Sequence, residues 1–333
     1  MHIPDNYLSP STCAVMFAAM VPVWTIAVNK VKAELKNVKM PMLGICAAFS
    51  FLLMMFNVPL PGGTTGHAVG GTLIAILIGP FAACISLTVA LLIQALMFGD
   101  GGILAFGANC FNMAFVLPFV GYFVYKFIKD SVHSEKGEYI GMAAGSYIGI
   151  NAAALCTAIE FGIQPLLFTT AAGQPLYSPY PLSVSIPAMI LPHLLVVGVL
   201  EAVFTVAIFV FIRKVSPGSL YEGGQQKSNR IFGLLAVLVC LTPLGLLAAG
   251  TAWGEWGTDQ IGDVVSGGAA LGFVPEGMHS GFRFVSLLPD YAVKGLPGAA
   301  GYILSAVAGA AILVIVFKVI STLKKDKTGS TRG

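Results

Sequence analysis

The first two residues, Met1 and His2, carry three nitrogen atoms that could bind one metal ion. The terminal amine of Met1, the backbone nitrogen of His2 and Nδ1 of its imidazole would close a five-membered and a six-membered chelate ring. Nitrogen donors in a square plane are typical of Ni(II) and Cu(II), whereas zinc prefers a tetrahedron. The start of the chain is therefore a candidate binding site for one of these two ions.

This chelate requires a free N-terminus. A bulky second residue such as His2 generally prevents removal of the initiating methionine, and no Lys or Arg precedes the first apolar run, as it would in a cleavable signal peptide. We expect Met1 to be the mature terminus. The alternative is a frayed tail with no role in binding.

His67 is the candidate for the fourth corner of the square. It lies in the glycine-rich stretch PGGTTGHAVGGT, where glycines let a second backbone approach closely. Alone, it could be an interfacial histidine that donates to a carbonyl; together with Met1 and His2 on one side of the molecule, we interpret it as a ligand. His133, His193 and His279 are expected to be solvated or packed.

Polar residues should surround a site of this kind. A divalent ion bound to one deprotonated backbone nitrogen keeps one positive charge, which a carboxylate or a dipole should balance. Asp5 could balance this charge or could turn the chain before the first helix, and Asp100 in FGDGG is expected to be a turn residue. Gln94, Asn109 and Asn112 are natural partners that orient the ligands, and interhelical hydrogen bonding is their alternative role.

The composition predicts that these residues belong to a polytopic helical membrane protein of the all-α class. The chain of 333 residues is 56% hydrophobic and only 10% charged, whereas about a quarter of the residues of a soluble domain are charged. Apolar runs long enough to cross about 30 Å of hydrocarbon recur between polar loops. Nine crossings are predicted, near residues 10–28, 40–58, 67–79, 81–98, 103–127, 139–162, 184–212, 231–250 and 301–321.

The basic residues predict the orientation. Sixteen of the 18 Lys and Arg residues follow the first, fifth, seventh and ninth predicted crossings, whereas the loops 58–66, 98–102 and 163–183 contain none. The positive-inside rule then places the N-terminus outside the cell membrane and the C-terminus in the cytoplasm. The net charge of +3 is accordingly a topology signal and no indication of nucleic-acid binding.

The chain divides into two predicted parts. Residues 1–214 form a seven-helix block, and residues 215–230, rich in Gly, Ser, Gln and charge, form a cytoplasmic linker. Residues 231–333 contain the last two helices, which enclose an outside segment, 251–300, too polar to be embedded in the membrane. No G-x-x-x-x-G-K-[ST], H-E-x-x-H or G-x-S-x-G motif occurs, so the sequence does not indicate an enzyme, and ATP-driven work would need a partner.

Four stretches of residues 1–214 resemble the nickel/cobalt substrate-binding subunit of energy-coupling factor transporters. They are MHIPDNYLSPSTCAVMFAAMVP, GGTTGHAVGGTLIAILIGP, IQALMFGDGGILAFGANCFNMAF and GINAAALCTAIEFGIQPLLF. The opening is closer to the nickel branch than to the cobalt branch, which more often begins MHIMEG. Residues 231–322, with LTPLGLLAAGTAWGEWG and LPDY, look like the small two-helix accessory subunit of the same systems, here fused to the binding subunit.

The resemblance implies a seven-helix S-component bundle that binds one ion from outside through Met1, His2 and His67. It also implies two kinds of partner: a membrane scaffold, the T component, and cytoplasmic ATPase subunits. Most members of the family have Gly where this chain has Asn6, a residue that can also adopt a left-handed turn.

The predicted function is uptake of Ni(II) as a transported substrate, with no catalytic cofactor. Uptake of Co(II) is the alternative within the same class, and the chelate chemistry alone would also admit copper. The alternatives from other classes are a membrane metal sensor or receptor and a metalloenzyme with an open site at the N-terminus.

Overall fold

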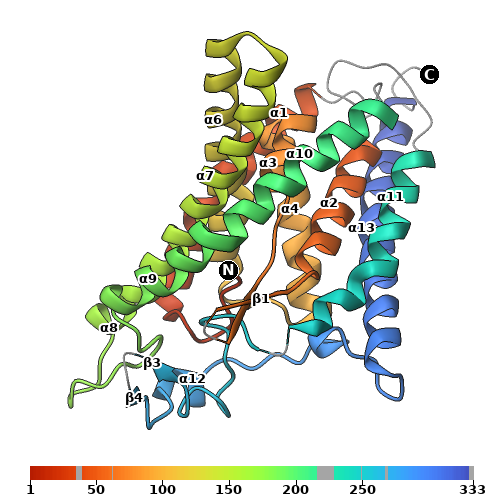
Figure 1. Cartoon of the computed structure of the whole chain (residues 1–333). Coiled ribbons are helices and arrows are strands. Elements are labelled where there is room, and N and C mark those ends of the chain that lie inside the picture. Colours follow the sequence, from red (N-terminus) through yellow and green to blue (C-terminus); the bar gives the residue numbers. More distant parts are fainter. Residues whose placement is uncertain (35–39, 62, 216–228, 249, 267–268, 330–333) are drawn as a thin grey trace.

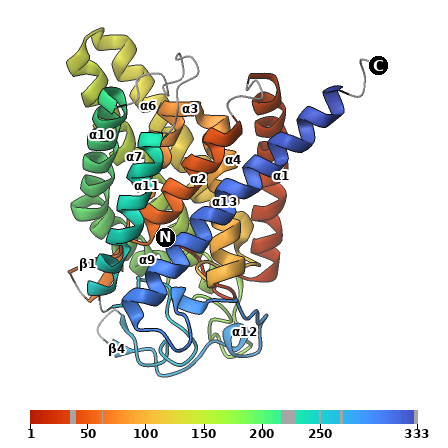
Figure 2. The ribbon, with the colours of Figure 1, turned by 90° about the vertical axis from the view of Figure 1, so that its right-hand side faces the viewer.

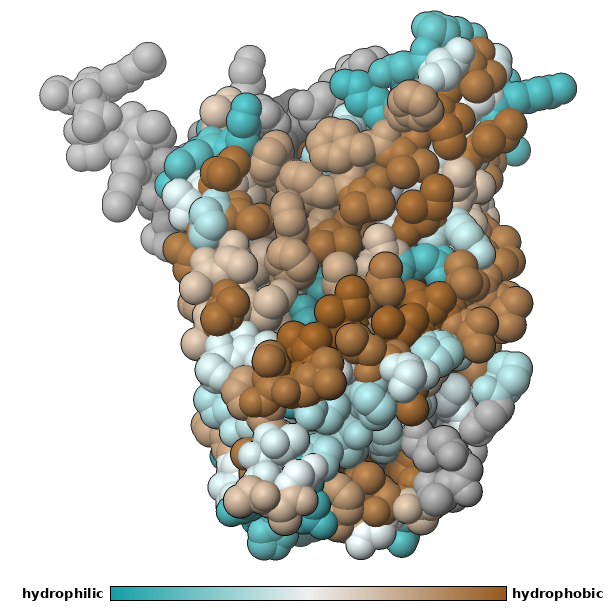
Figure 3. All heavy atoms as spheres, turned by 90° about the vertical axis from the view of Figure 1, so that its left-hand side faces the viewer, coloured by the Kyte–Doolittle hydropathy of each residue, from teal (hydrophilic) through white to brown (hydrophobic). Residues whose placement is uncertain are grey.

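The computed structural model describes residues 1–34, 40–61, 63–215, 229–248, 250–266 and 269–329. Helices run side by side through most of the molecule, and a layer of loops covers one end, which we call the loop end (Figures 1 and 2). On the face in Figure 3, apolar side chains form a broad band between hydrophilic groups at the two ends, as expected for helices that meet lipid. The predicted class, a polytopic helical membrane protein, is confirmed.

Six of the described helical segments are long and apolar enough to cross a membrane. They are Pro10–Ala33, Pro80–Phe98, Phe106–Val132, Glu135–Leu167, Leu182–Lys214 and Gly298–Thr322. Two further segments, Met40–Met54 and Ile231–Leu247, are apolar but shorter. These eight correspond in order to eight of the nine predicted crossings.

The third predicted crossing, residues 67–79, is helical over only part of its length. Its helix, α3 (Gly71–Ile78), has eight residues and spans about 12 Å at 1.5 Å per residue, well short of a bilayer. The left-handed Gly70 (φ 74°) precedes it, and Gly79 (φ 89°) followed by Pro80 ends it. The residues before it, including His67, are non-helical backbone enclosed by other helices, where such backbone is tolerated.

Residues 1–215 form seven helical rods, several of which contain a π-helical turn. The elements are α1 (Pro10–Glu34), α2 (Met40–Met54), α3, α4 (Pro80–Ile93) with η1 (Gln94–Phe98), α5 (Phe106–Asn109) with η2 (Cys110–Val116) and α6 (Leu117–Val132), α7 (Glu135–Gly162) with the short α8 (Gln164–Leu167), and α9 (Leu182–Pro192) with η3 (His193–Val197) and α10 (Gly198–Val215). Strands β1 (Val58–Leu60) and β2 (Thr64–Gly66) pair antiparallel just before His67.

The C-terminal part packs on the bundle through α2. It consists of α11 (Asn229–Leu241) with the 3₁₀ turn η5 (Thr242–Leu247), the loop-end segment 250–297, and α13 (Gly298–Gly329), which crosses α2 obliquely (Figure 2). Gly44 allows close packing, since a Cβ there would lie 3.1 Å from Phe317. Most of the predicted linker, residues 216–228, lies outside the described residues, and the domain boundaries remain predictions.

The segment 250–297 contains little regular structure. It includes β3 (Val265–Ser266) paired with β4 (Ala269–Ala270), α12 (Glu276–His279) and the 3₁₀ turn η6 (Pro289–Tyr291). A small apolar cluster, separate from the main core, joins it to the start of the chain: Ile3, Tyr7 and Leu8 pack with Ile261 and Met278. The N-terminus therefore lies between the bundle and this segment (Figure 1).

Candidate metal centre

The N-terminal strand is buried and held at its backbone. Met1, His2 and Ile3 are 6%, 2% and 0% exposed. The side chain of Asn109 binds both sides of Ile3: its Oδ1 accepts from the Ile3 N–H at 2.8 Å, and its Nδ2 donates to the Ile3 carbonyl at 3.0 Å. The Gly102 N–H donates to the same carbonyl at 2.8 Å. Within the structure, the first residues are thus ordered and are not a frayed tail.

His2 and His67 lie against each other. Their ring centroids are 5.2 Å apart, and the planes are inclined by 37°. Nδ1 of His67 lies 3.2 Å from the Ala68 carbonyl, which can only accept a hydrogen bond, so this nitrogen carries the proton and Nε2 keeps its lone pair. The two histidines predicted as ligands are therefore brought together, with Nε2 of His67 available for a metal ion.

Glu201 of α10 fixes the loop that carries His67. Its carboxylate is buried and accepts from the backbone N–H groups of Val69 at 2.7 Å and Gly70 at 2.8 Å. The left-handed Gly70 aims its N–H at this carboxylate, and a Cβ at that position would lie 2.8 Å from Phe49. This contact leaves no sign in the sequence, because no local pattern connects Glu201 with a loop 131 residues away.

His2 is held in the neutral form that binds metals. Burial, reinforced by the positive charge of the nearby N-terminal amine, lowers the pKa of His2 to about 3. A neutral imidazole does not have to lose a proton to present a lone pair to an ion. Proton release on binding at this site would therefore come from the terminal amine and the His2 amide.

Asp100 contacts His2 directly, although the sequence suggested only a turn. Its Oδ1 lies 3.1 Å from Nδ1 of His2. Its Oδ2 accepts from the hydroxyl of Tyr291 and from Nε2 of Gln94, which is 3.1 Å away. Gln94 thus contacts the carboxylate that faces His2, and Tyr291 reaches the same carboxylate from the C-terminal part.

Glu255 lies against the terminal amine. Its Oε1 is 3.4 Å from the Met1 nitrogen, across 254 residues of sequence. Burial raises the pKa of Glu255 to about 7, and the positive charge of the amine opposes that rise. The sequence placed this residue in the outside segment without a role, since a contact over such a separation leaves no local signal.

Two of the residues predicted to support the ligands are engaged elsewhere. Oδ1 of Asp5 accepts from the Leu104 N–H at 2.7 Å and so joins two loops. Asn112 donates to Glu160 at 2.7 Å in α7. Asn112 lies within the π-helix η2, which begins directly after Asn109. Its hydrogen bond to α7 is the interhelical role that the sequence left open for it.

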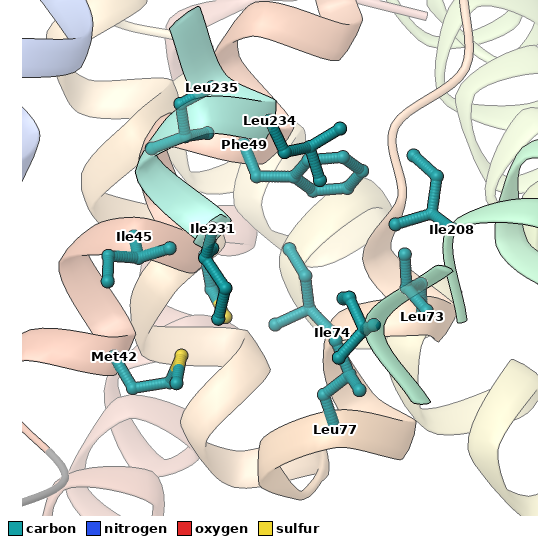
Figure 4. A pocket seen from close by; sticks show the side chains of 12 residues that line it. Met42, Ile45, Phe49, Leu73, Ile74, Leu77, Ile208, Ile231, Leu234 and Leu235 are labelled. Atoms are coloured by element: carbon teal, nitrogen blue, oxygen red, sulfur yellow. The ribbon is translucent and has the colours of Figure 1, made fainter. Parts of the chain in front are cut away.

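The other histidines do not join this group. His133 and His279 are exposed, and Nδ1 of the buried His193 lies 2.6 Å from the Met189 carbonyl. His193 and His67 line a cavity of about 20 Å³ that Met1 and Trp253 also border. A second cavity, of about 30 Å³, lies between α2, α3, α10 and α11 and is lined by apolar side chains and the Cys46 thiol (Figure 4). It offers no donor set for an ion.

Side chains alone do not complete a metal site at this place, so main-chain nitrogens would have to serve as donors. Among the described residues no group of three or more His, Cys, Asp and Glu side chains is placed to hold a metal ion. A site here needs the terminal amine and the His2 backbone nitrogen in addition to the imidazoles of His2 and His67. Such a nitrogen set suits a square-planar ion.

Known proteins resemble the chain over its whole length. Residues 2–219 match the family described as the cobalt uptake substrate-specific transmembrane region, CbiM, and residues 227–326 match the PDGLE domain. The probable fused nickel transport protein LarMN of Lactiplantibacillus plantarum is 53% identical over 321 residues, 96% of this chain and 97% of that protein. The fused nickel transport protein NikMN of Rhodobacter capsulatus is 47% identical over 330 residues, 94% and 95% of the two chains.

A solved structure covers the bundle. The crystal structure of a transition metal transporter, 59% identical in sequence, covers 65% of this chain and 93% of that chain with a TM-score of 0.61. The family resemblance and the fusion of two parts, both inferred from sequence motifs, are confirmed by these matches.

Proposed function

Because the chain belongs to the family of cobalt uptake substrate-specific transmembrane regions, we propose that it is the metal-binding membrane subunit of a nickel importer. The ion would be held by four nitrogens: the Met1 amine, the backbone nitrogen and Nδ1 of His2, and Nε2 of His67. The observation that carries this proposal is the 5.2 Å approach of the two imidazoles beside a buried, clamped N-terminus.

The surroundings of these nitrogens fit the exchange of protons for a metal ion. Nδ1 of His2 now faces Asp100 and the amine faces Glu255, so each donor is held by a carboxylate that can accept its hydrogen bond. When a divalent ion binds, the amine loses one proton and the His2 amide loses another, while the proton of the neutral His2 imidazole moves from Nδ1 to Nε2. One net positive charge is then left on the centre. Asn109 keeps the backbone of Ile3 in place during this exchange.

Nickel is favoured over cobalt by the two relatives described above, each of which covers nearly the whole chain and carries nickel in its name. Four nitrogens in a plane are typical of Ni(II). Cobalt uptake by the same route is the alternative, because the family itself is described by cobalt.

The transport step needs partners. We propose that the protein works with the scaffold T component and the cytoplasmic ATPase subunits of an energy-coupling factor complex, because its sequence has no nucleotide-binding loop. The loop end would face outside: it lies opposite the helix ends that carry the basic residues, where Arg213 of α10 pairs with Glu138 of α7 at 3.3 Å. In this role the chain is a transport subunit and not an enzyme.

Uptake of radioactive nickel tests the proposal. Cells that express the protein with its scaffold and ATPase subunits should accumulate nickel, and His2→Ala should abolish accumulation because it removes Nδ1 and with it the six-membered chelate ring. His279→Ala, a change at an exposed histidine of the loop end, is the matched control. Equal uptake by the two variants would contradict the chelate. Wild-type protein that binds nickel but supports no accumulation would favour a membrane metal sensor or receptor.

A further inference from the structure

The C-terminal part reaches the predicted metal site with a single carboxylate. Glu255 and the Met1 nitrogen are 3.4 Å apart, and the side chain of Glu255 is 21% exposed. Asp100, the other carboxylate close to the site, is directed at His2 and is bound by Gln94 and Tyr291. Among the described residues, Glu255 is therefore the carboxylate assigned to the amine corner of the chelate.

The position of Glu255 is built into the loop end. Its N–H donates to the Ala252 carbonyl at 3.0 Å, which closes a tight turn. Gly254 within that turn has φ 82°, and a Cβ there would lie 2.8 Å from the Phe161 ring. A residue other than glycine would thus be strained by its backbone and would clash with α7.

Aromatic side chains hold both sides of this turn. The rings of Trp253 and Trp256 are 5.9 Å apart, and Tyr180 packs on Trp253 at 5.1 Å. The Trp256 carbonyl accepts from the hydroxyl of Tyr7 at 2.9 Å. The turn is therefore anchored to the N-terminal strand and to the bundle, not attached only at its own ends.

A second contact anchors the same segment farther along. Nδ2 of Asn6 donates to the Phe282 carbonyl at 2.8 Å, and Oδ1 of Asn6 accepts from the Phe282 N–H at 2.9 Å. A glycine at position 6 could take the same left-handed conformation but could not make this pair of hydrogen bonds. Asn6 thus ties the N-terminal strand to the C-terminal part.

The charge that faces Glu255 is the same with and without a bound ion. Without metal, the ammonium of Met1 carries one positive charge. With a divalent ion, the loss of one proton from the amine and one from the His2 amide leaves one positive charge on the centre. A partly buried carboxylate at this corner can balance both states without moving, so the positive charge of the centre is not left unpaired in a site that is largely closed to water.

We propose that Glu255 is the counter-ion of the metal centre, so that the binding site is shared between the bundle, which supplies the ligands, and the C-terminal part, which supplies the balancing charge. This inference rests on the proposed binding of a divalent ion by Met1, His2 and His67. Glu255 acts here through charge and position and is not itself a ligand. It would favour ions that leave one net positive charge on the chelate.

Equilibrium titration of the purified full-length protein with Ni(II) tests this role. Glu255→Gln keeps the shape of the side chain and removes its charge, and it should weaken affinity by about ten- to a hundred-fold, the usual range for residues that support metal ligands. The d–d absorption band of the complex should keep its position, because the four nitrogens are unchanged. Glu255→Asp should recover part of the affinity.

Asp259→Asn is the matched control. It removes one negative charge from the same segment at an exposed side chain four residues away, and it should leave affinity within about two-fold of wild type. Wild-type affinity in Glu255→Gln, or an equal loss in both variants, would overturn the assignment of the counter-ion. If the absorption band of Glu255→Gln shifts, the residue is a ligand, and that result also overturns the proposal.

One further titration separates this inference from the proposed function. His2→Ala should lose nickel binding whatever the role of Glu255. If His2→Ala binds normally, the chelate itself is wrong. If His2→Ala loses nickel binding while Glu255→Gln keeps it, the result supports the chelate and contradicts the counter-ion role of Glu255.

Discussion

The bundle and the C-terminal part both contact the N-terminal strand, but they do so with different chemistry. The bundle binds the backbone of the N-terminal strand with neutral groups. The Asn109 side-chain amide makes hydrogen bonds to the N–H and the carbonyl of Ile3, and the Gly102 N–H adds a third hydrogen bond to that carbonyl. The C-terminal part places a charge and a hydroxyl group near the donors: Glu255 faces the amine, and Tyr291 donates to Asp100, the carboxylate of the bundle that faces His2.

This difference separates two roles: some groups set the position of the donor nitrogens, and others balance the positive charge of the centre. Hydrogen bonds from neutral groups to the strand backbone set where the donor nitrogens lie. These hydrogen bonds remain the same whether the donor nitrogens hold protons or a metal ion. Carboxylates set how well a positive centre is tolerated in a buried place. We therefore expect changes in the bundle to distort or remove the chelate, and changes in the C-terminal part to alter affinity while the coordination persists.

The largest effect is expected from His67→Ala. The bundle would lose the one ligand that does not come from the N-terminal strand, and nickel affinity should fall by more than about a hundred-fold, beyond the loss usual for supporting residues. Titration followed by the absorption band of bound nickel measures this, with the exposed His279→Ala as control. If affinity stays at the wild-type value, the fourth ligand lies elsewhere.

A smaller but still large loss is expected from Asn109→Ala. Both hydrogen bonds to Ile3 disappear, the strand that carries His2 gains freedom, and affinity should drop by about ten- to a hundred-fold. The absorption band should broaden or shift, because geometry is affected as well as charge. Asn151→Ala is the control, since that amide donates within its own helix to the Tyr147 carbonyl. An unchanged affinity and band would show that the bundle does not position the chelate.

The smallest effect is expected from Tyr291→Phe in the C-terminal part. Asp100 loses one hydrogen-bond donor but keeps Gln94, so affinity should fall by about five-fold, the equivalent of one hydrogen bond of about 1 kcal/mol, with no change of the band. Tyr302→Phe removes a buried hydroxyl of the same part that donates to the Met55 carbonyl, and it should not alter affinity. A larger loss for Tyr291→Phe than for Asn109→Ala would reverse the division of roles between the two regions.

Much of the fold could be predicted because lipid leaves few choices to a chain this apolar. Runs such as 10–28 and 139–162 correspond to α1 and α7, since a spanning backbone must satisfy its hydrogen bonds within a helix. The half-length α3 could not be predicted from hydropathy. Its apolar residues continue into α4, and the left-handed Gly70 with its carboxylate partner Glu201 sets where the helix begins.

Part of the site could be predicted for a chemical reason. The donor atoms of Met1 and His2 are adjacent in the chain, so their chelate rings follow from covalent structure alone. The residue type of an amide did not predict its partner. Asn109 binds the N-terminal strand, whereas Asn112, three residues later and within a π-helix, binds Glu160. The roles of Met1, His2 and His67 as ligands remain predictions, as does the outward orientation of the N-terminus.

The amino-acid sequence was sufficient for the membrane class, the family, the candidate ligands and the side of the membrane predicted for them, because each of these depends on local composition or on motifs of contiguous residues. The identity of the two carboxylates at the site, Asp100 and Glu255, required the folded chain. The contact between Glu255 and Met1 joins residues 254 positions apart, and it exists because α11 and α13 pack on the bundle and bring the segment between them over the N-terminus. A charge so distant in sequence reaches its partner only through packing, and packing leaves no local pattern.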